Sequence, residues 1–267
     1  MTQNNQLIRN VKTNIITGFL GVGKTTAINK LLDKRLLHER WSVLVNELGE
    51  RGIDGHLMEE NTDTKVTIKQ VPGGCICCAA GLPLQVAVNQ LLRQTHPDRL
   101  IIEPSGMGHP RNILKSLTAP VYHNVLDMRA CLCLLDPRKL KDLRYLESEL
   151  FIDQMDVADR IVANKTDLCC SRDKDNFKRF IAQRYKNKAT SWIRHAELQR
   201  DWLDETHHDS VKTEATLSNR LESCFYKISL DFSLDTIFDY AGITQFIDSL
   251  SGVERFKGIL HTSKGFI

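Results

Sequence analysis

Short apolar runs alternate with segments of helical periodicity along most of the chain. Each run is a near-continuous stretch of aliphatic residues, as in a strand buried on both faces of a parallel sheet. Between the runs, apolar residues recur every three or four positions, as on one face of a helix. This alternation predicts an α/β fold, a mostly parallel sheet with helices on both faces. The predicted strands are residues 14–17, 41–46, 66–71, 99–102, 128–135 and 160–163, and the predicted helices are residues 82–94, 147–155 and 172–188 and the segments that follow Lys24 and surround Ile113.

The pattern becomes less regular after Lys188. We expect a helix at 192–202, a strand at 224–230, a helix at 234–250 and a strand at 253–261. The predicted organisation is an α/β domain of residues 1–204, a polar linker of residues 205–221 and a small α+β domain of residues 222–267. That last unit is too small to bury a core well by itself, so we expect it to pack against a partner surface.

One turn between a predicted strand and a predicted helix has the pattern of a phosphate-binding P-loop. Residues 18–25 read Gly-Phe-Leu-Gly-Val-Gly-Lys-Thr, which fits Gly, any four residues, Gly-Lys-Ser/Thr. The glycines let the backbone approach phosphates at a helix N-terminus, although a plain glycine turn with an exposed lysine is the alternative. Lys24 would contact the β- and γ-phosphates, and the Thr25 hydroxyl would bind Mg2+. The predicted nucleotide contacts here are Gly18, Gly21, Val22, Gly23, Lys24, Thr25 and Thr26.

An acidic residue ends a later apolar strand. Glu103 follows residues 99–102 and leads into Pro104-Ser105-Gly106. Downstream of a P-loop, a carboxylate in this position is expected to serve Mg2+ or to organise a water molecule. Gly106 would let the backbone approach the γ-phosphate.

The strand at 160–163 leads into Asn164-Lys165-Thr166-Asp167. The Asp167 carboxylate could accept hydrogen bonds from two N–H donors of guanine, a pair that adenine does not offer. A carboxylate left unpaired by the wrong base discriminates strongly, so we expect GTP rather than ATP. Asn164 would brace this loop, and the stem of Lys165 would lie over the base.

Three cysteines stand close together after the strand at 66–71. Pro72-Gly73-Gly74 leads into Cys75-Ile76-Cys77-Cys78, and thiolates in this arrangement suit Zn2+ or Cu(I). A fourth tetrahedral position could be filled by Glu47 or Glu50 from the long acidic loop that follows the strand at 41–46. The alternative is that the three cysteines are small buried hydrophobic residues.

Composition and charge exclude several classes of function. The net charge of +3, with basic and acidic residues mixed along the chain, argues against nucleic acid or a membrane surface as partner. No apolar run reaches the roughly 18 residues of a membrane span, and the polar start lacks the core of a secretion signal, so we expect a cytoplasmic location. The eight cysteines are then expected to be metal ligands or reactive thiols before disulfides.

The remaining cysteines and histidines give weaker indications. Cys131 and Cys133 lie two residues apart in a β-rich run, where core packing is the favoured interpretation. Cys169-Cys170 is ambiguous. His207-His208 could contact a metal, but a solvated polar linker is the favoured interpretation.

Together these motifs resemble the CobW family of metal-handling P-loop GTPases, relatives of the nickel chaperones UreG and HypB. The resemblance covers nearly the whole chain and rests on residues 18–25, 46–50, 75–78, 103–106, 164–167 and 253–258. It implies a SIMIBI-type P-loop fold and slow GTP hydrolysis coupled to delivery of a metal, zinc in this branch, to a metal-dependent client protein, with a homodimer as a further expectation. It also implies Cys75, Cys77 and Cys78 as zinc ligands, assisted by glutamates of the first loop. Two positions depart from the family pattern. Val45 stands where some relatives carry a glutamate. The family's C-terminal domain usually continues beyond the point that corresponds to Ile267, so we expect an incomplete C-terminal domain.

The favoured function is therefore a GTPase in which water attacks the γ-phosphate in line. Lys24, the loop amides and Mg2+ would stabilise the developing charge, with Thr25 and Glu103 holding the ion. We expect the loop at 47–55 to order on GTP and to link the nucleotide to the thiolates. Two alternatives stay open: a kinase or other P-loop phosphotransferase, and a nucleotide-sensing protein in which the cysteines hold a structural zinc.

Overall fold

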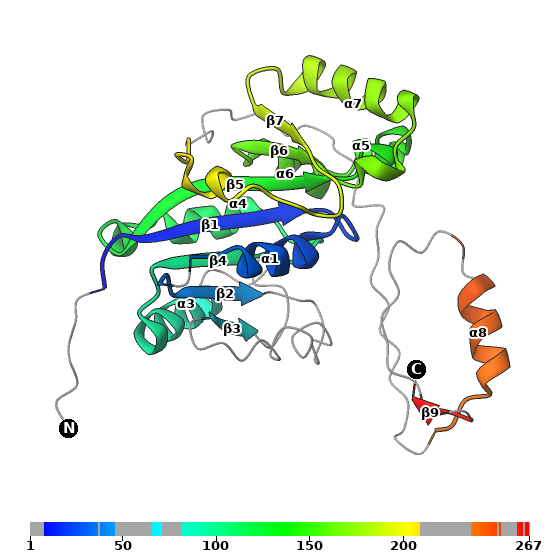
Figure 1. Ribbon diagram of the computed structural model, residues 1–267, viewed down its shortest axis with the longest axis horizontal. Coiled ribbons are helices and arrows are strands. Elements are labelled where there is room, and N and C mark those ends of the chain that lie inside the picture. The colour runs from blue at the N-terminus through cyan, green and yellow to red at the C-terminus, as the bar shows by residue number, and fades with distance from the viewer. Residues whose placement is uncertain are drawn as a thin grey trace. The chain divides into compact units, whose positions relative to one another are not determined.

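The computed structural model describes residues 8–36, 38–45, 66–70, 82–208, 236–249, 251, 261–263 and 265–266. The chain divides into two compact units, residues 1–223 and residues 224–267. The first unit contains the α/β sheet, and the second contains one helix and a short hairpin among its described residues (Figure 1).

A seven-stranded parallel sheet forms the centre of the first unit, with strand order β3-β2-β4-β1-β5-β6-β7. The buried apolar runs make these strands, which confirms the predicted α/β class and each of the six predicted strand positions. Because the strands run in one direction, their carboxyl ends share one edge of the sheet (Figure 1). The strands are β1 Val11–Gly18, β2 Trp41–Val45, β3 Val66–Gln70, β4 Arg99–Glu103, β5 Leu126–Leu135, β6 Arg160–Ala163 and β7 Ala189–Trp192.

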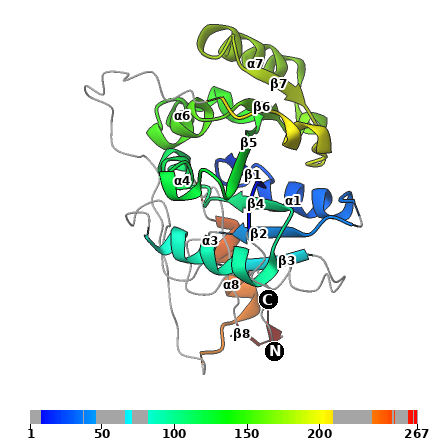
Figure 2. The ribbon, with the colours of Figure 1, turned by 90° about the vertical axis from the view of Figure 1, so that its left-hand side faces the viewer.

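Helices cover both faces of the sheet, with α1 on one side and α4 and α6 on the other (Figure 2). Each buries a stripe of apolar residues, and α7, which lies within the helix predicted at 172–188 apart from its first residue, buries Phe177 and Phe180. The longer helices of this unit are α1 Lys24–Asp33, α3 Leu82–Thr95, α4 Pro110–Leu117, α6 Glu149–Asp156 and α7 Ser171–Arg184. The shorter turns are η1 Pro120–Tyr122, η2 Pro137–Lys141, α5 Leu143–Leu146, η3 Thr166–Leu168 and η4 Arg200–Asp204.

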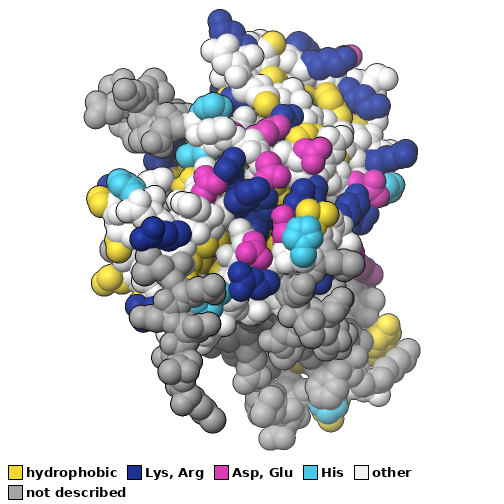
Figure 3. All heavy atoms as spheres, turned by 60° about the vertical axis from the view of Figure 1, so that its left-hand side comes forward, with side chains coloured by type: hydrophobic (Ala, Val, Ile, Leu, Met, Phe, Trp, Pro, Cys, Tyr) yellow, Lys and Arg dark blue, Asp and Glu magenta, His cyan; other side chains and the backbone are white. Residues whose placement is uncertain are grey.

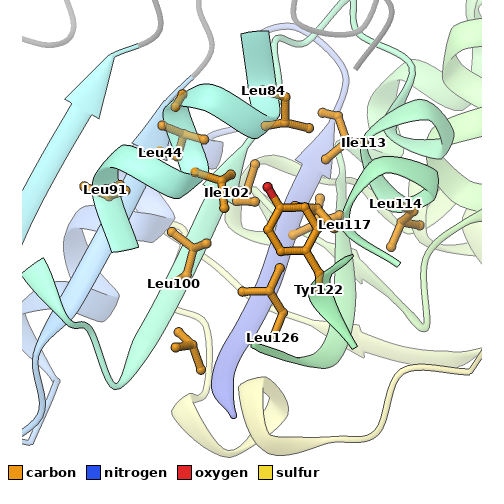
Figure 4. Packing of buried hydrophobic residues seen from close by; sticks show 14 of the residues in the cluster. Leu44, Leu84, Leu91, Leu100, Ile102, Ile113, Leu114, Leu117, Tyr122 and Leu126 are labelled. Carbon is orange, nitrogen blue, oxygen red and sulfur yellow. The ribbon is translucent and has the colours of Figure 1, made fainter. Parts of the chain in front are cut away.

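The principal core cluster joins α3 and α4 to the central strands (Figure 4). Its members include Leu91 from α3, Leu117 from α4 and Ile102 from β4, each no more than 1% exposed. Burying an aliphatic side chain of this size contributes about 1.5–3 kcal/mol, so the cluster holds both helices on the sheet. The sheet then positions the described turns that follow β1, β4 and β6 at its carboxyl edge.

The helix predicted for residues 192–202 is wrong. Residues 189–192 form β7 instead, because pairing with β6 along Arg160–Ala163 outweighs the local apolar spacing. His195 and Ala196 then have φ angles of 52° and 59°, which a right-handed helix cannot include. Only Arg200–Asp204 is helical in this region, as the short turn η4.

Lys12, Arg99 and Asp204 form an ionic cluster at the amino edge of the sheet. Arg99, 1% exposed, donates to the side chains of Asn14 and Asp204, and Lys12 also pairs with Asp204 at 2.9 Å. Burial raises the pKa of Asp204, but the hydrogen bonds from Lys12 and Arg99 outweigh it and leave the pKa lowered. The face seen in Figure 3 carries basic and acidic side chains side by side. The contacts of Lys12 and Arg99 with Asp204 join η4 to β1 and β4.

The side chain of His207 is buried, whereas the sequence predicted a solvated linker at this position. Its Nδ1 lies 2.8 Å from Asp159 Oδ2, and its side chain is only 8% exposed. Thr206 forms a bridge with Arg129 of β5, so the chain still follows the sheet at this point. His208 is exposed, although its backbone N–H donates to Asp159.

The second unit has the helix α8, Tyr240–Ser249, and the antiparallel pair β8 His261–Thr262 and β9 Gly265–Phe266. The helix lies within the predicted range 234–250, whereas the strand predicted at 224–230 and most of that at 253–261 lie outside the described residues. Phe246 of α8 is 50% exposed, and packing of this unit against a partner surface stays a prediction. No described helix is both long and apolar enough to cross a membrane.

Candidate functional site

The P-loop connects the end of β1 to the start of α1. Gly18, Gly21 and Gly23 have φ angles of 139°, 70° and 98°, which residues with a Cβ rarely adopt. At Gly18 a Cβ would also come within 2.4 Å of the Leu134 carbonyl oxygen. The sequence needs glycine at these positions to form a loop whose backbone curls around the N-terminus of α1.

Lys24 lies inside this loop. Its side chain is buried, and Nζ donates to the carbonyl oxygens of Gly18 at 2.9 Å and Phe19 at 3.3 Å. The ammonium group is therefore held at the mouth of the loop, where a phosphate bound by the N-terminus of α1 would meet a positive charge. Thr26 follows in the first turn of α1.

Thr25 and Glu103 are brought together from neighbouring elements. The Thr25 hydroxyl donates to Oε1 of Glu103 at 2.8 Å, and Glu103 is 4% exposed at the end of β4. A hydroxyl and a carboxylate are hard oxygen donors, which Mg2+ prefers, so these residues fit a magnesium ion beside the P-loop. A cation here would also compensate the charge of this buried carboxylate.

Gly106 packs against the P-loop. A Cβ at Gly106 would lie 3.0 Å from the backbone N of Leu20 and 2.8 Å from its Cδ2. Glycine thus allows the turn after β4 to contact the phosphate loop directly. The Ser105 carbonyl accepts from Gly108 N at 2.9 Å, which closes this turn.

Asn164 links three segments of the site. Its Nδ2 donates to the Val22 carbonyl at 2.9 Å, and its Oδ1 accepts from Ala196 N at 3.0 Å. It is 1% exposed, so both hydrogen bonds are shielded from water. The predicted bracing role of Asn164 has this geometric support, but Ala196 was not identified from the sequence. The pair of positive φ angles at residues 195 and 196 has no sequence pattern that indicates it.

Lys165 and Asp167 flank the same loop. Lys165 has φ 60° and donates from Nζ to the Gly21 carbonyl at 2.7 Å, with Asp136 at 3.7 Å on its other side. Asp167 Oδ2 lies 3.9 Å from Nδ1 of His195, so this carboxylate faces the loop after β7. Asp136 and His195 are neighbours of the site that sequence reasoning did not select, because their positions depend on the strand order.

The predicted thiolate site lies outside the part of the chain that the structure describes. Cys75, Cys77, Cys78, Glu47 and Glu50 lie outside the described residues. Among the residues that are described, no group of three or more His, Cys, Asp or Glu side chains is arranged to hold a metal.

The other described cysteines have local roles. Cys131 and Cys133 are buried in β5, which confirms their predicted core position, and burial raises the pKa of both thiols, that of Cys133 to about 12. Cys170 precedes α7, where its thiol contacts the Asp173 carboxylate and its backbone N–H donates to the same group. Cys169 donates to the Lys165 carbonyl. Burial and the raised pKa of Cys131 and Cys133 fit a packing role for these two thiols.

Comparison with known proteins places this geometry in context. The profile of the CobW/HypB/UreG nucleotide-binding domain matches residues 12–191. This range contains the P-loop, Glu103, Gly106 and the segment Asn164-Lys165-Thr166-Asp167.

Several curated relatives and solved structures are similar to the chain. The zinc chaperone YeiR of Escherichia coli (strain K12) is 41% identical over 96% of this chain and 84% of its own length. The zinc chaperone CobW of Sinorhizobium sp. is 30% identical over 59% of this chain and 51% of its own length. The crystal structure of Zn(II)-bound YjiA GTPase from E. coli has a TM-score of 0.53 at 20% identity, covering 91% of this chain and 78% of that one. This structural likeness supports the P-loop fold.

Proposed function

The chain belongs to the CobW/HypB/UreG family of nucleotide-binding domains, and from this premise we propose that it is a GTP-hydrolysing metallochaperone. In this proposal it binds zinc through Cys75-Ile76-Cys77-Cys78 and couples GTP binding and hydrolysis to transfer of the ion to a metal-dependent client protein. Residues 1–204 act as the GTPase domain, residues 205–221 as a linker and residues 222–267 as a small C-terminal domain.

The observation that carries the nucleotide half of the proposal is the position of Asn164. Its side chain bonds both Val22 and Ala196, which supports a nucleotide site built from the phosphate loop, the predicted base loop and the segment after β7. Asp167 then reads the two N–H donors of guanine, and the stem of Lys165 lies along the base. A base bound in this place would have its phosphates at the N-terminus of α1.

Hydrolysis in this site is mainly a matter of charge stabilisation and orientation. The backbone N–H groups of the P-loop and the Lys24 ammonium donate to the phosphate oxygens as negative charge moves onto them. Thr25 and Glu103 would hold Mg2+, which would supply positive charge next to the phosphates. Gly106 brings the backbone after β4 near the terminal phosphate, since it already contacts Leu20 of the P-loop.

The metal half of the proposal rests on chemistry and on relatives. Three thiolates from Cys75, Cys77 and Cys78, with Glu47 or Glu50 as an oxygen ligand, suit Zn2+. The relatives named as zinc chaperones support zinc as the cargo. In the sequence, β2 precedes the loop at 47–55 and β3 precedes Cys75, and these two strands are parallel neighbours whose carboxyl ends lie at the same edge of the sheet. We propose that this loop couples the two halves by ordering on GTP.

Zinc transfer tests the proposal directly. The protein is loaded with one equivalent of Zn2+, and release to a coloured chelator is followed without nucleotide, with GDP and with a non-hydrolysable GTP analogue. The release rate is expected to depend on the nucleotide, and Cys77→Ala is expected to abolish tight zinc binding. Cys170→Ser, which changes an exposed thiol outside the motif, is the matched control. Zinc that is retained equally in every nucleotide state would contradict transfer and indicate a structural metal.

A further inference from the structure

A buried glutamine of α6 holds the turn that follows β4. Gln154 is 0% exposed, and its Nε2 donates to the carbonyl oxygen of Gly106 at 3.0 Å and to that of Gly108 at 3.5 Å. The Oε1 atom of this side chain is buried and accepts no hydrogen bond within the described part of the chain. Within the described residues, the two carbonyls are the hydrogen-bond partners of this amide group.

The same turn also packs against the P-loop. Gly106 lies so close to Leu20 that a Cβ would be 3.0 Å from the Leu20 backbone N. Within the turn, Met107 N donates to the Ser105 hydroxyl at 3.3 Å, and Gly108 N donates to the Ser105 carbonyl at 2.9 Å. The turn is therefore enclosed between the phosphate loop and Gln154, and its peptide units have one orientation.

The Gly106 amide is not used within this turn. The Gly106 N–H donates to no acceptor among the described residues, whereas the amides of residues 107 and 108 are both bonded within the turn. The Gly106 N–H belongs to the peptide unit of the Ser105 carbonyl, which accepts from Gly108 N at 2.9 Å, and Gln154 holds the next peptide unit through the Gly106 carbonyl, so rotation of either unit is resisted. An anion beside the P-loop would meet a donor whose direction has already been set.

The residue before Gln154 anchors the segment that continues from this turn. Asp153 accepts from Nε of Arg111 at 2.7 Å, and its Oδ2 lies 3.5 Å from Nδ1 of His109. His109 and Arg111 flank the first residue of α4. Two consecutive side chains of α6 therefore hold residues 106–111, from the glycine at the P-loop to the first turn of α4.

We propose that Gln154 is a positioning residue for the γ-phosphate, acting through the Gly106 carbonyl to fix the turn that distinguishes GTP from GDP, with Asp153 fixing the segment after it. The inference rests on the proposed GTPase function and identifies how the same site senses the terminal phosphate. The γ-phosphate is the one part of GTP that GDP lacks. Loss of the clamp therefore weakens GTP binding and leaves GDP binding intact.

The test compares two affinities in the full-length protein. Gln154→Met keeps a side chain of similar length but removes the donor, and Met155→Leu is a control at a buried neighbour on the same helix. Affinities for GDP and for a non-hydrolysable GTP analogue are measured by calorimetry. We expect Gln154→Met to weaken the analogue about tenfold, which is the loss of roughly one hydrogen bond, while GDP affinity is unchanged. An unchanged ratio of the two affinities, or a parallel loss of both, would overturn the proposal.

Hydrogen exchange on the wild-type protein gives a second test that needs no variant to fold. Amides of residues 105–111 are expected to exchange more slowly with the GTP analogue than with GDP. Equal exchange in the two complexes would overturn the positioning role. A wild-type protein that binds both nucleotides but neither hydrolyses GTP nor responds to zinc would contradict the proposed function, and the affinity ratio would still decide the role of Gln154.

Discussion

The hydroxyl of Thr25 donates a hydrogen bond to Oε1 of Glu103 at 2.8 Å, although 78 residues separate them in the sequence. The contact exists because β1 and β4 are adjacent parallel strands, so the start of α1 and the end of β4 meet at one edge of the sheet. It places a hydroxyl and a carboxylate beside the phosphate loop. This pair is the basis for the first prediction.

Glu103→Gln is expected to reduce GTP turnover by about 10²-fold, because an amide cannot supply the charge that holds Mg2+ near the developing negative charge. The Mg2+ concentration for half-maximal turnover should rise in the same variant. Glu197→Gln, which changes an exposed glutamate paired with Lys30, serves as the control. Wild-type turnover in Glu103→Gln, at the usual Mg2+ requirement, would show that this carboxylate does not serve the ion.

Asp167→Asn is expected to lower GTP affinity by roughly 10- to 100-fold, since an amide cannot accept from both N–H donors of guanine and the loss of a charged acceptor costs about 1.5–3 kcal/mol. Xanthosine triphosphate, whose base carries an additional carbonyl that accepts from the new amide, should bind this variant better than the wild type. Competition binding with GTP, ATP and xanthosine triphosphate measures both effects. If Asp167→Asn keeps the wild-type preference for GTP, another residue reads the base.

Asn164→Ala is expected to weaken GDP and the GTP analogue to the same extent, in contrast to Gln154→Met. The substitution leaves the buried Val22 carbonyl and the Ala196 N–H without their partner, and each such group costs about 1–3 kcal/mol. The midpoint of thermal unfolding should therefore also fall. Calorimetric titration and a melting curve on the same preparation check both outcomes, and selective loss of the GTP analogue would contradict this assignment.

The ionic cluster around Asp204 should make stability depend on pH. A carboxylate whose pKa is lower in the folded than in the unfolded state contributes stability above its unfolded pKa, about 3.9, and that contribution is lost as the pH falls through the folded pKa. Asp204→Asn should thus be less stable than the wild type at neutral pH, and the difference should shrink below about pH 4. Urea denaturation over a pH series measures it.

Asp201→Asn, an exposed change in the same turn η4, should match the wild type throughout that series. A stability difference for Asp204→Asn that stays constant down to the lowest pH would show that its carboxylate does not contribute through its charge.

The parts of the fold that could be predicted are those with a local cause. Aliphatic runs such as Leu100-Ile101-Ile102 are 0% exposed in the sheet, because only a central strand buries consecutive residues on both faces. The P-loop could also be predicted from the sequence, since its glycines are required by backbone angles that other residues avoid. Cys131 and Cys133 were placed in the core correctly because strand periodicity puts them on one face.

The contacts that the sequence did not predict are those between segments that become neighbours only because of the order of strands in the sheet. Neither the hydrogen bond between Asn164 and Ala196 nor that between Gln154 and Gly106 has a sequence signature, because each depends on which strands and helices become neighbours. The error at 192–202 has the same origin, since pairing with β6 decided the conformation of β7. His207 was expected in solvent because its pairing with Asp159 is also non-local.

The most direct test of the whole account is GTP turnover by the purified protein with and without stoichiometric Zn2+, measured for the wild type, Cys77→Ala and the control Cys170→Ser. Coupling of the nucleotide and thiolate sites predicts that zinc changes the wild-type rate, that Cys77→Ala removes this effect, and that Cys170→Ser retains it. A wild-type rate that ignores zinc, while zinc still binds through the cysteines, would contradict the coupling and with it the metallochaperone function.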